Sequence, residues 1–202
     1  MALLRLSTGH VYTTLEDISK RIGSVRIGKF DYPESFRSAV ARLQVPLTDE
    51  GITLLTNNLD VNAVALPKKE GLTFRRLGCI IPPTNTNPQF VFSFGKTQDD
   101  SKPTQMSEEQ LAAYAAPHCV LANDWHFTMR GGIIKGLQLE NAMQGVLYVQ
   151  PGEWIRLNPK VINWPIFPVG EPSIGVSFFD KDWGTFGQEA HPEVTVRPEM
   201  RY

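Results

Sequence analysis

The stretch that decides the fold reads Val149-Gln-Pro-Gly-Glu-Trp-Ile-Arg-Leu-Asn-Pro159-Lys-Val-Ile-Asn-Trp164. It opens with a turn, Pro151-Gly152-Glu153, and continues into a short, largely apolar run that ends at Leu157. Proline and glycine are the strongest turn-forming residues, and an apolar run of this length beside them is typical of a β-strand. The stretch therefore predicts a tight turn, a strand, and a further strand around Trp164.

Short segments of the same kind lie on both sides of this stretch. Turn-forming residues separate them, for example Gly131-Gly132, Asn141 and Gly170. Many short strands at regular spacing predict a β-sandwich or a β-barrel. The strands predicted in this way are Ile52 to Leu55, Leu72 to Ile81, Gln89 to Phe94, Trp125 to Thr128, Ile133 to Leu139, Gly145 to Val149, Trp154 to Leu157, Val161 to Ile166 and Ile174 to Phe179.

Three segments have features of helices instead. They are Val11 to Ile22, which Thr13 or Thr14 can cap, Ser35 to Leu43, and Ser107 to Ala115. A chain of 202 residues is long enough to bury one well-formed core, so we expect a single domain. Within it we expect a helical N-terminal cover over residues 1–50, the β-barrel over residues 51–182 and a C-terminal tail over residues 183–202.

Composition and charge exclude several classes of protein. Lys and Arg total 20 against 21 Asp and Glu, so the chain has no electrostatic footprint for nucleic acid or for an anionic membrane surface. The two cysteines, Cys79 and Cys119, have no paired spacing, which argues against a disulfide framework and a structural zinc site. No apolar stretch has the length of a signal peptide or a membrane span, so we expect a cytoplasmic protein.

The stretch quoted above resembles the second signature of the cupin superfamily. That signature has a Pro-Gly-Asp/Glu turn, an apolar strand, a proline and a metal-binding histidine, and here Asn163 stands at the histidine position. The first signature has two histidines, an acidic residue and a glycine. Counted from His118, these later positions hold Val120, Asp124 and Gly131. The resemblance implies a mostly β, single-domain cupin (jelly-roll) β-barrel with a few N-terminal and peripheral helices.

The layout is similar to that of the acireductone dioxygenases, which also have helices before the barrel and a similar interval between the signatures. In that family three histidines and one carboxylate hold a metal that activates dioxygen and an enediol substrate. This chain matches the family at His118 and, with a shorter carboxylate, at Asp124, and it departs at Val120 and Asn163. Cupins often dimerise through edge strands, so the resemblance also allows a homodimer.

The two departures change what the barrel can bind. Valine has no lone pair and the amide oxygen of asparagine is a weak ligand, so we predict no metal cofactor. One alternative stays open, because residues two apart on a strand face the same side, which would place His126 beside Asp124. His118, Asp124 and His126 would then form a displaced two-His-one-carboxylate set for weakly bound Fe or Ni, with dioxygenase chemistry.

Without a metal, a His-Asp pair inside a barrel can still perform proton chemistry, because a neighbouring carboxylate raises the pKa of an imidazole and fixes its tautomer. We therefore predict isomerase, cyclase or lyase chemistry on a small organic molecule. In this scheme Asn163 donates to a developing oxyanion. The predicted catalytic residues are His118, Asp124, His126 and Asn163, and the predicted substrate-binding residues are Trp125, Trp154, Arg156 and Trp164.

A non-catalytic protein on the same fold, either a ligand-binding pseudoenzyme or a structural subunit of an assembly, is the other class of function that the sequence allows. An enzyme requires polar residues that converge inside the barrel, whereas a structural subunit would fill the barrel with apolar side chains. Two further residues are assigned structural roles. Cys119 is predicted to be a buried packing residue, and His191, in the tail, a surface histidine.

Overall fold

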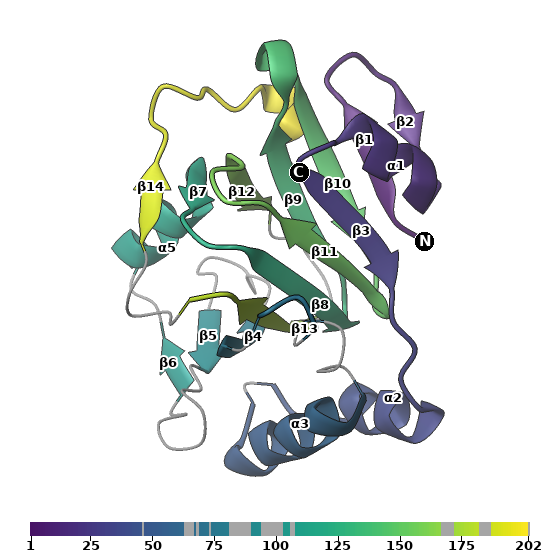
Figure 1. Ribbon diagram of the computed structural model, residues 1–202. Helices are drawn as coiled ribbons and strands as arrows, with labels where there is room; N and C mark the ends of the chain where they lie inside the picture. Colours follow the sequence, from purple (N-terminus) through teal and green to yellow (C-terminus); the bar gives the residue numbers. More distant parts are fainter. Residues whose placement is uncertain are drawn as a thin grey trace.

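The computed structural model of the chain describes residues 1–45, 47–62, 67, 69–72, 74–80, 90–93, 103–105, 108–166, 172–181 and 187–201. Within these residues the strands form two antiparallel sheets (Figure 1). The first sheet contains, in spatial order, β14 (Gln188–Ala190), β7 (His118–Val120), β12 (Asn163–Ile166), β9 (Ile133–Gln138), β10 (Gln144–Val149), β1 (Leu3–Leu6) and β2 (Val11–Tyr12). The second contains β3 (Val25–Lys29), β11 (Glu153–Leu157), β8 (Asp124–Arg130), β13 (Ser173–Phe179), β4 (Phe74–Ile80), β5 (Phe90–Ser93) and β6 (Pro103–Gln105).

The chain changes sheet repeatedly in its second half. β7, β9, β10 and β12 belong to the first sheet, whereas β8, β11 and β13 belong to the second, so the chain crosses between the sheets at every step except the β9–β10 hairpin. Such crossing between two facing antiparallel sheets is the jelly-roll arrangement. The predicted mostly β, cupin-like fold is therefore confirmed.

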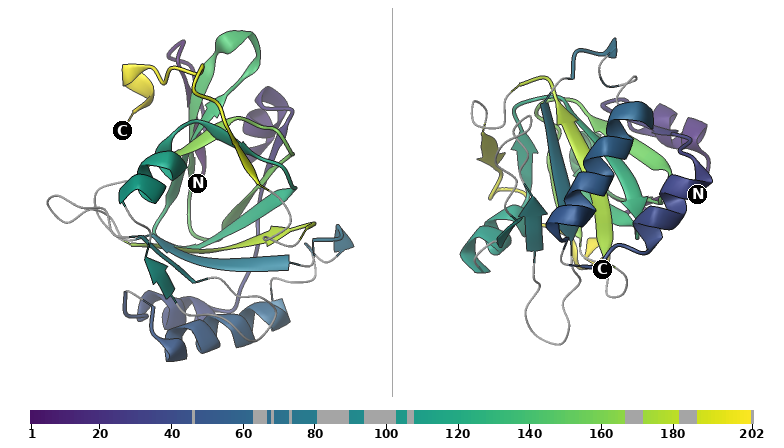
Figure 2. Two further views of the ribbon diagram at one scale, coloured as in Figure 1. Left: turned by 90° about the vertical axis from the view of Figure 1, so that its left-hand side faces the viewer. Right: turned by 90° about the horizontal axis from the view of Figure 1, so that it is seen from below.

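Helices lie outside the sandwich. Figures 1 and 2 show α2 and α3 side by side against the outer face of the second sheet. Their apolar side chains, among them Phe36 and Leu55, form one buried cluster with Trp125 and Phe178 of that sheet. The helices are α1 (Leu15–Arg21), α2 (Glu34–Ala41), α3 (Asp49–Asn62) and α5 (Glu108–Ala115), with short 3-10 turns at Glu140–Ala142 and Pro198–Met200.

The predicted strand Ile52 to Leu55 is wrong, since these residues lie inside α3. The backbone carbonyl of Thr48 accepts from the Ile52 N–H at 2.9 Å, and its side-chain oxygen accepts from the Gly51 N–H at 3.2 Å. This is the hydrogen bonding of a helix N-cap. A short run such as Ile52-Thr-Leu-Leu55, with three apolar residues of four, does not distinguish a strand from a turn of buried helix, so the cap decides.

The N-terminal region also differs from the expected helical cover. The segment from Val11 begins as a strand, and helix α1 starts only at Leu15, with Thr14 as its N-cap as predicted. β1 pairs with β10 and β3 pairs with β11, so the first thirty residues extend both sheets. The predicted helices Ser35 to Leu43 and Ser107 to Ala115 are confirmed as α2 and α5, with slightly different ends.

The predicted turn at Pro151-Gly152-Glu153 is confirmed, and it joins the two sheets to the N-terminus. Gly152 has a φ of +84°, a left-handed conformation that favours glycine. The buried carboxylate of Glu153 accepts hydrogen bonds from the backbone N–H groups of Ala2 and Gln150, both at 2.9 Å. The turn therefore also holds the N-terminal residues on the barrel.

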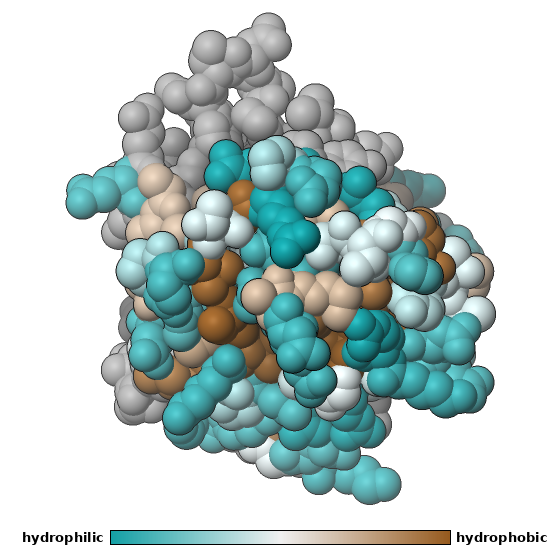
Figure 3. Space-filling view, turned by 90° about the horizontal axis from the view of Figure 1, so that it is seen from above, coloured by the Kyte–Doolittle hydropathy of each residue, from teal (hydrophilic) through white to brown (hydrophobic). Residues whose placement is uncertain are grey.

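The three larger apolar clusters among the described residues stabilise these layers. One lies under α2 and α3, and a second lies between the sheets, where Ile133 and Leu147 meet Ile155 and Leu157. The third covers the outer face of the first sheet, where residues of the C-terminal tail such as Met200 pack on Trp164. Figure 3 shows apolar residues in a band framed by hydrophilic ones on the upper face. Among the described helices, none is both long and apolar enough to cross a membrane.

Candidate functional site

The interior face of the second sheet follows from side-chain alternation along β8. Trp125 and Phe127 belong to the cluster under the helices, so the alternate residues Asp124, His126 and Thr128 face the space between the sheets. The pairing of β8 with β11 agrees, because Asp124 and His126 lie opposite Leu157 and Ile155, which pack in the interior cluster. Residues 124 and 126 therefore share one side of the second sheet, the side that faces the first sheet.

The interior face of the first sheet carries three polar side chains. Ile133 and Leu137 pack between the sheets, so Lys135, which stands between them on β9, shares their face. Asn163 lies opposite Leu137, and His118 lies opposite Asn163. Residues from three strands, β7, β12 and β9, therefore present His118, Asn163 and Lys135 to the interior.

Asn163 is buried and its amide is occupied by the protein itself. Its nitrogen donates to the backbone carbonyls of His118 at 3.3 Å and Val161 at 3.1 Å. Its oxygen accepts from the ammonium group of Lys135 at 3.1 Å. Both N–H groups are used, so the geometry does not support the predicted role of Asn163 as an oxyanion donor and instead makes it the residue that positions Lys135.

His118 is a buried, neutral imidazole. Its Nδ1 lies 2.8 Å from the backbone carbonyl oxygen of Ala116, and because a carbonyl only accepts, Nδ1 carries the hydrogen and Nε2 keeps its lone pair. Burial, reinforced by the positive charge of Lys135, lowers the pKa of His118 from 6.5 to about 4. The sequence led us to expect a carboxylate that raises the pKa of an imidazole here. For His118 the strongest neighbouring charge is a cation instead, so its pKa falls.

The pair on β8 has a different environment. Nδ1 of His126 lies 2.8 Å from the hydroxyl oxygen of Ser177, its neighbour across the sheet. Gly175 leaves room for the ring, because a Cβ at that position would lie 2.3 Å from Nε2 of His126. Asp124 lies opposite Phe179, which packs with Val120 and Ala122 at the connection from β7 to β8.

All four predicted catalytic residues therefore face the same interior, but from opposite sheets. His118 and Asn163 are direct neighbours in the first sheet, whereas Asp124 and His126 are neighbours in the second. Their catalytic roles stay predictions.

The residues predicted to bind substrate lie elsewhere. Trp154 and Arg156 share the outer face of the second sheet with Trp125, and Arg156 forms an ion pair with Glu70 at 2.8 Å. Trp164 lies on the outer face of the first sheet, under the C-terminal tail. A ligand between the sheets would not meet any of these four side chains, so the prediction is corrected. On these strands aromatic side chains that point outward alternate with side chains that point between the sheets. The outward aromatic side chains are buried because helices cover the outer face of the second sheet and the C-terminal tail covers that of the first.

Sequence reasoning missed Lys135. Its signal was present, because a single lysine in the run Ile133-Ile-Lys-Gly-Leu137 falls at an inward position when the side chains of the strand alternate between its two faces.

Sequence reasoning also missed a cluster on the opposite face of β7, formed by Cys119, Glu189 and His191. Cys119 is 1% exposed, which confirms it as buried, and burial together with Glu189 raises the pKa of its thiol. His191 is not a free surface histidine, since its side chain is 19% exposed and bonds Glu193.

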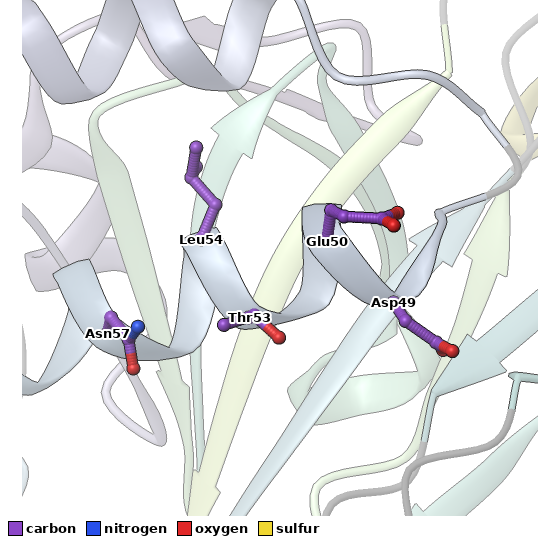
Figure 4. A pocket seen from close by; sticks show the side chains of 5 residues that line it. All are labelled: Asp49, Glu50, Thr53, Leu54 and Asn57. Carbon is purple, nitrogen blue, oxygen red and sulfur yellow. The ribbon is translucent and has the colours of Figure 1, made fainter.

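A hollow on the helical side of the molecule does not bring reactive groups together. It is lined by Asp49, Glu50, Thr53, Leu54 and Asn57, all from α3. Figure 4 shows these side chains pointing in different directions from the helix. The pKa of Glu50 is lowered by its own backbone N–H and by Thr48, so its carboxylate belongs to the cap of α3.

Two of the four residues at the positions that the resemblance assigns to metal ligands, Val120 and Asn163, do not fit a metal ion. Val120 has no ligand atom, and the oxygen of Asn163 is occupied by the ammonium group of Lys135. A divalent cation at this point would be repelled by that ammonium charge. The displaced set of His118, Asp124 and His126 draws on both sheets and stays a prediction.

Comparison with known proteins supports the fold. No family model and no curated protein matches the sequence. Among solved structures, an acireductone dioxygenase from Bacillus anthracis with a cadmium ion in its active centre is similar, with a TM-score of 0.61 and 14% identity. The match covers 90% of this chain and 94% of that one. At this identity the likeness shows a cupin-like fold and leaves the chemistry to be argued from the residues.

Proposed function

We propose that this chain is a cupin-fold enzyme that performs acid-base chemistry on a small, anionic organic molecule between the two sheets. The observation that carries the proposal is the placement of Lys135. Its ammonium group contacts Asn163, at the position where the resemblance implies a metal-binding histidine. A fixed cation at that point can stabilise the negative charge of an enolate or a carboxylate, which is a task that a metal ion performs in related chemistry.

His118 is the candidate base. Its Nε2 lone pair is available because Nδ1 donates to Ala116, and its main-chain carbonyl is tied to Asn163. A substrate anion bound at Lys135 would offset the charge that acts on the imidazole and make His118 a stronger base. Proton removal next to a carbonyl group, with the enolate held by Lys135, is the common first step of isomerase, cyclase and lyase reactions, so these remain the reaction classes we propose.

Asp124 and His126 complete the proposed site from the facing sheet. Two groups that can carry protons on one side of a substrate, and a base on the other, allow a proton to be removed and returned at different atoms. The aromatic residues Trp125, Trp154 and Trp164 have no part in this scheme, since they pack in the outer cores.

Two alternatives are kept. A dioxygenase with iron or nickel at His118, Asp124 and His126 is favoured by the likeness to a metal-containing dioxygenase structure. A non-catalytic binding or structural protein is favoured by the apolar filling of the other half of the interior, where Leu137 and Leu147 meet Ile155.

The test uses chelator-treated protein in D2O with pyruvate, 2-oxobutyrate and acetoacetate, followed by NMR. We expect the hydrogen next to the carbonyl group of at least one of these compounds to exchange with solvent deuterium. The rate of this exchange should be unchanged by chelator, and the exchange should be abolished in His118→Ala and His126→Ala. Exchange that appears only after addition of Fe(II) or Ni(II) would support the dioxygenase instead. Binding without exchange would support the non-catalytic protein, and either result rejects the proposal.

A further inference from the structure

Strand β7 carries a second set of reactive side chains on the face opposite His118. Glu189 of β14 lies directly opposite Cys119 in the ladder, and His191 follows two residues later. The Cys119 sulfur, a carboxylate oxygen of Glu189 and a ring nitrogen of His191 all lie within 4.8 Å of one another. We propose that these three side chains bind a zinc ion that joins the C-terminal tail to the barrel.

The donor set selects the metal. A thiolate, an imidazole and a carboxylate are the three ligand types that zinc takes in proteins, whereas calcium and magnesium take oxygen ligands. Zinc bonds of about 2.0 to 2.3 Å in a tetrahedron place ligand atoms roughly 3.5 Å apart. The present separations need only a small closing movement, and the exposed side chain of Glu189 can supply it, while the buried Cys119 stays in place.

His191 is already oriented as a ligand. Its Nδ1 lies 2.8 Å from a carboxylate oxygen of Glu193, so Nδ1–H donates to Glu193 and Nε2 keeps its lone pair. Nε2 is buried and has no hydrogen-bond partner among the residues that the structure describes. Histidines that bind zinc commonly donate their other ring N–H to a carboxylate in this way, which fixes the tautomer and strengthens the ligand.

Binding would couple two parts of the fold. The coordinating thiol loses its proton to solvent, and the fourth position of the tetrahedron takes a water molecule. The ion would link β7, which carries His118 on its other face, with β14 and the tail. That tail is also held by the short ladder Gln188–Ala190, by the packing of Val194, Val196 and Met200, and by hydrogen bonds of Gln144 with Thr195 and Arg197. The site is independent of the proposed acid-base chemistry.

The full chain, freed of metal with a chelator, is titrated with Zn(II) in competition with a chromophoric chelator, and in parallel with Co(II). We expect one equivalent of zinc, a thiolate-to-cobalt charge-transfer band, and a zinc-dependent rise in Tm. Cys119→Ser and His191→Gln should lose about 100-fold or more in zinc affinity and Glu193→Gln about 10-fold, since outer-shell partners contribute less than ligands. The control His10→Ala removes an exposed imidazole that is hydrogen-bonded to the side chain of Thr8, and this variant should bind zinc like the parent.

Because Cys119 is buried, Cys119→Ser is checked for folding by circular dichroism. Glu189→Gln provides a second variant with an exposed side chain, and it should fold and bind zinc more weakly. The proposal is overturned if the parent does not bind zinc. It is also overturned if Cys119→Ser and Glu189→Gln both bind zinc as tightly as the parent. Zinc binding that is lost in His118→Ala but kept in His191→Gln also overturns it, since the metal would then lie inside the barrel.

Discussion

The two faces of β7 differ in how their polar groups are held. On the inner face His118 and its neighbour Asn163 are buried. Both the amide oxygen and the amide nitrogen of Asn163 are hydrogen-bonded to other groups of the protein. On the outer face Cys119 is buried but Glu189 is exposed, and Nε2 of His191 has no partner within the described chain. A closed hydrogen-bond network suits a preorganised site, whereas an imidazole lone pair without a partner beside an exposed carboxylate suits the capture of an ion.

This comparison shows that neighbouring residues of one strand can serve separate chemistry. His118 and Cys119 are adjacent in sequence, yet strand alternation sends them to opposite sides of the sheet. Their charge environments differ accordingly, because Lys135 acts most strongly on His118 and Glu189 on Cys119. Variants on each face should therefore change different measurements.

The largest effect is expected on the inner face. Lys135→Met should slow the proton exchange catalysed by the protein about 100-fold to 1000-fold, because it removes the cation that stabilises the developing charge. Lys20→Met, which removes an exposed lysine paired with Glu16 on α1, is the matched control and should leave exchange unchanged. Equal rates for the two variants, measured by NMR in D2O, would remove Lys135 from the site.

Acid should destabilise the protein through the inner face. The pKa of His118 is about 4 in the folded state and 6.5 when exposed, so the unfolded state binds more protons between these values. Stability present above pH 6.5 is therefore lost as the pH falls, by about 3 kcal/mol between pH 7 and pH 4. Urea unfolding at both pH values should show this loss, and His118→Gln should show it to a smaller degree; identical losses would contradict the assignment.

Removal of a hydrogen-bonded side chain should also cost more inside than outside. Asn163→Leu leaves two buried carbonyl groups and Lys135 without their partner, which we expect to lower the free energy of unfolding by about 2 kcal/mol. Glu189→Gln on the outer face should change it by less than about 0.5 kcal/mol in zinc-free protein. Similar costs for both, in denaturant titrations, would break the distinction between the faces.

The smallest effect concerns the charge coupling itself. Lys135→Met should raise the pKa of His118, because the ammonium group disfavours the imidazolium form, although burial keeps the pKa below its ordinary value. NMR titration of the histidine ring protons would measure this shift. Lys20→Met should leave the curve of His118 in place, and a downward shift in Lys135→Met would contradict the coupling.

Local sequence was sufficient for much of the second half of the chain. The turn at Gly152 and the strands that follow have strong short-range signals, and β8, β9, β10, β11, β12 and β13 all match predicted segments closely. The N-terminal strands were missed because β1 and β3 are specified by their partners β10 and β11, which lie over a hundred residues away. Strand formation depends on such pairing more than on local preference.

For the site, the sequence by itself determined the inward positions of the four predicted catalytic residues, but it did not identify Lys135 and it assigned four outward-facing residues to substrate binding. Alternation placed Asp124 and His126 on one side, and the spacing of two signatures placed His118 and Asn163 at equivalent positions. Only the tertiary structure decided what these residues contact, because hydrogen bonds and charges act across strands that are distant in sequence. Strand pairing places Lys135 beside Asn163, and it places Glu189 and His191 beside Cys119. The tryptophans face outward because the helices and the C-terminal tail cover the outer faces of the sheets and bury them there.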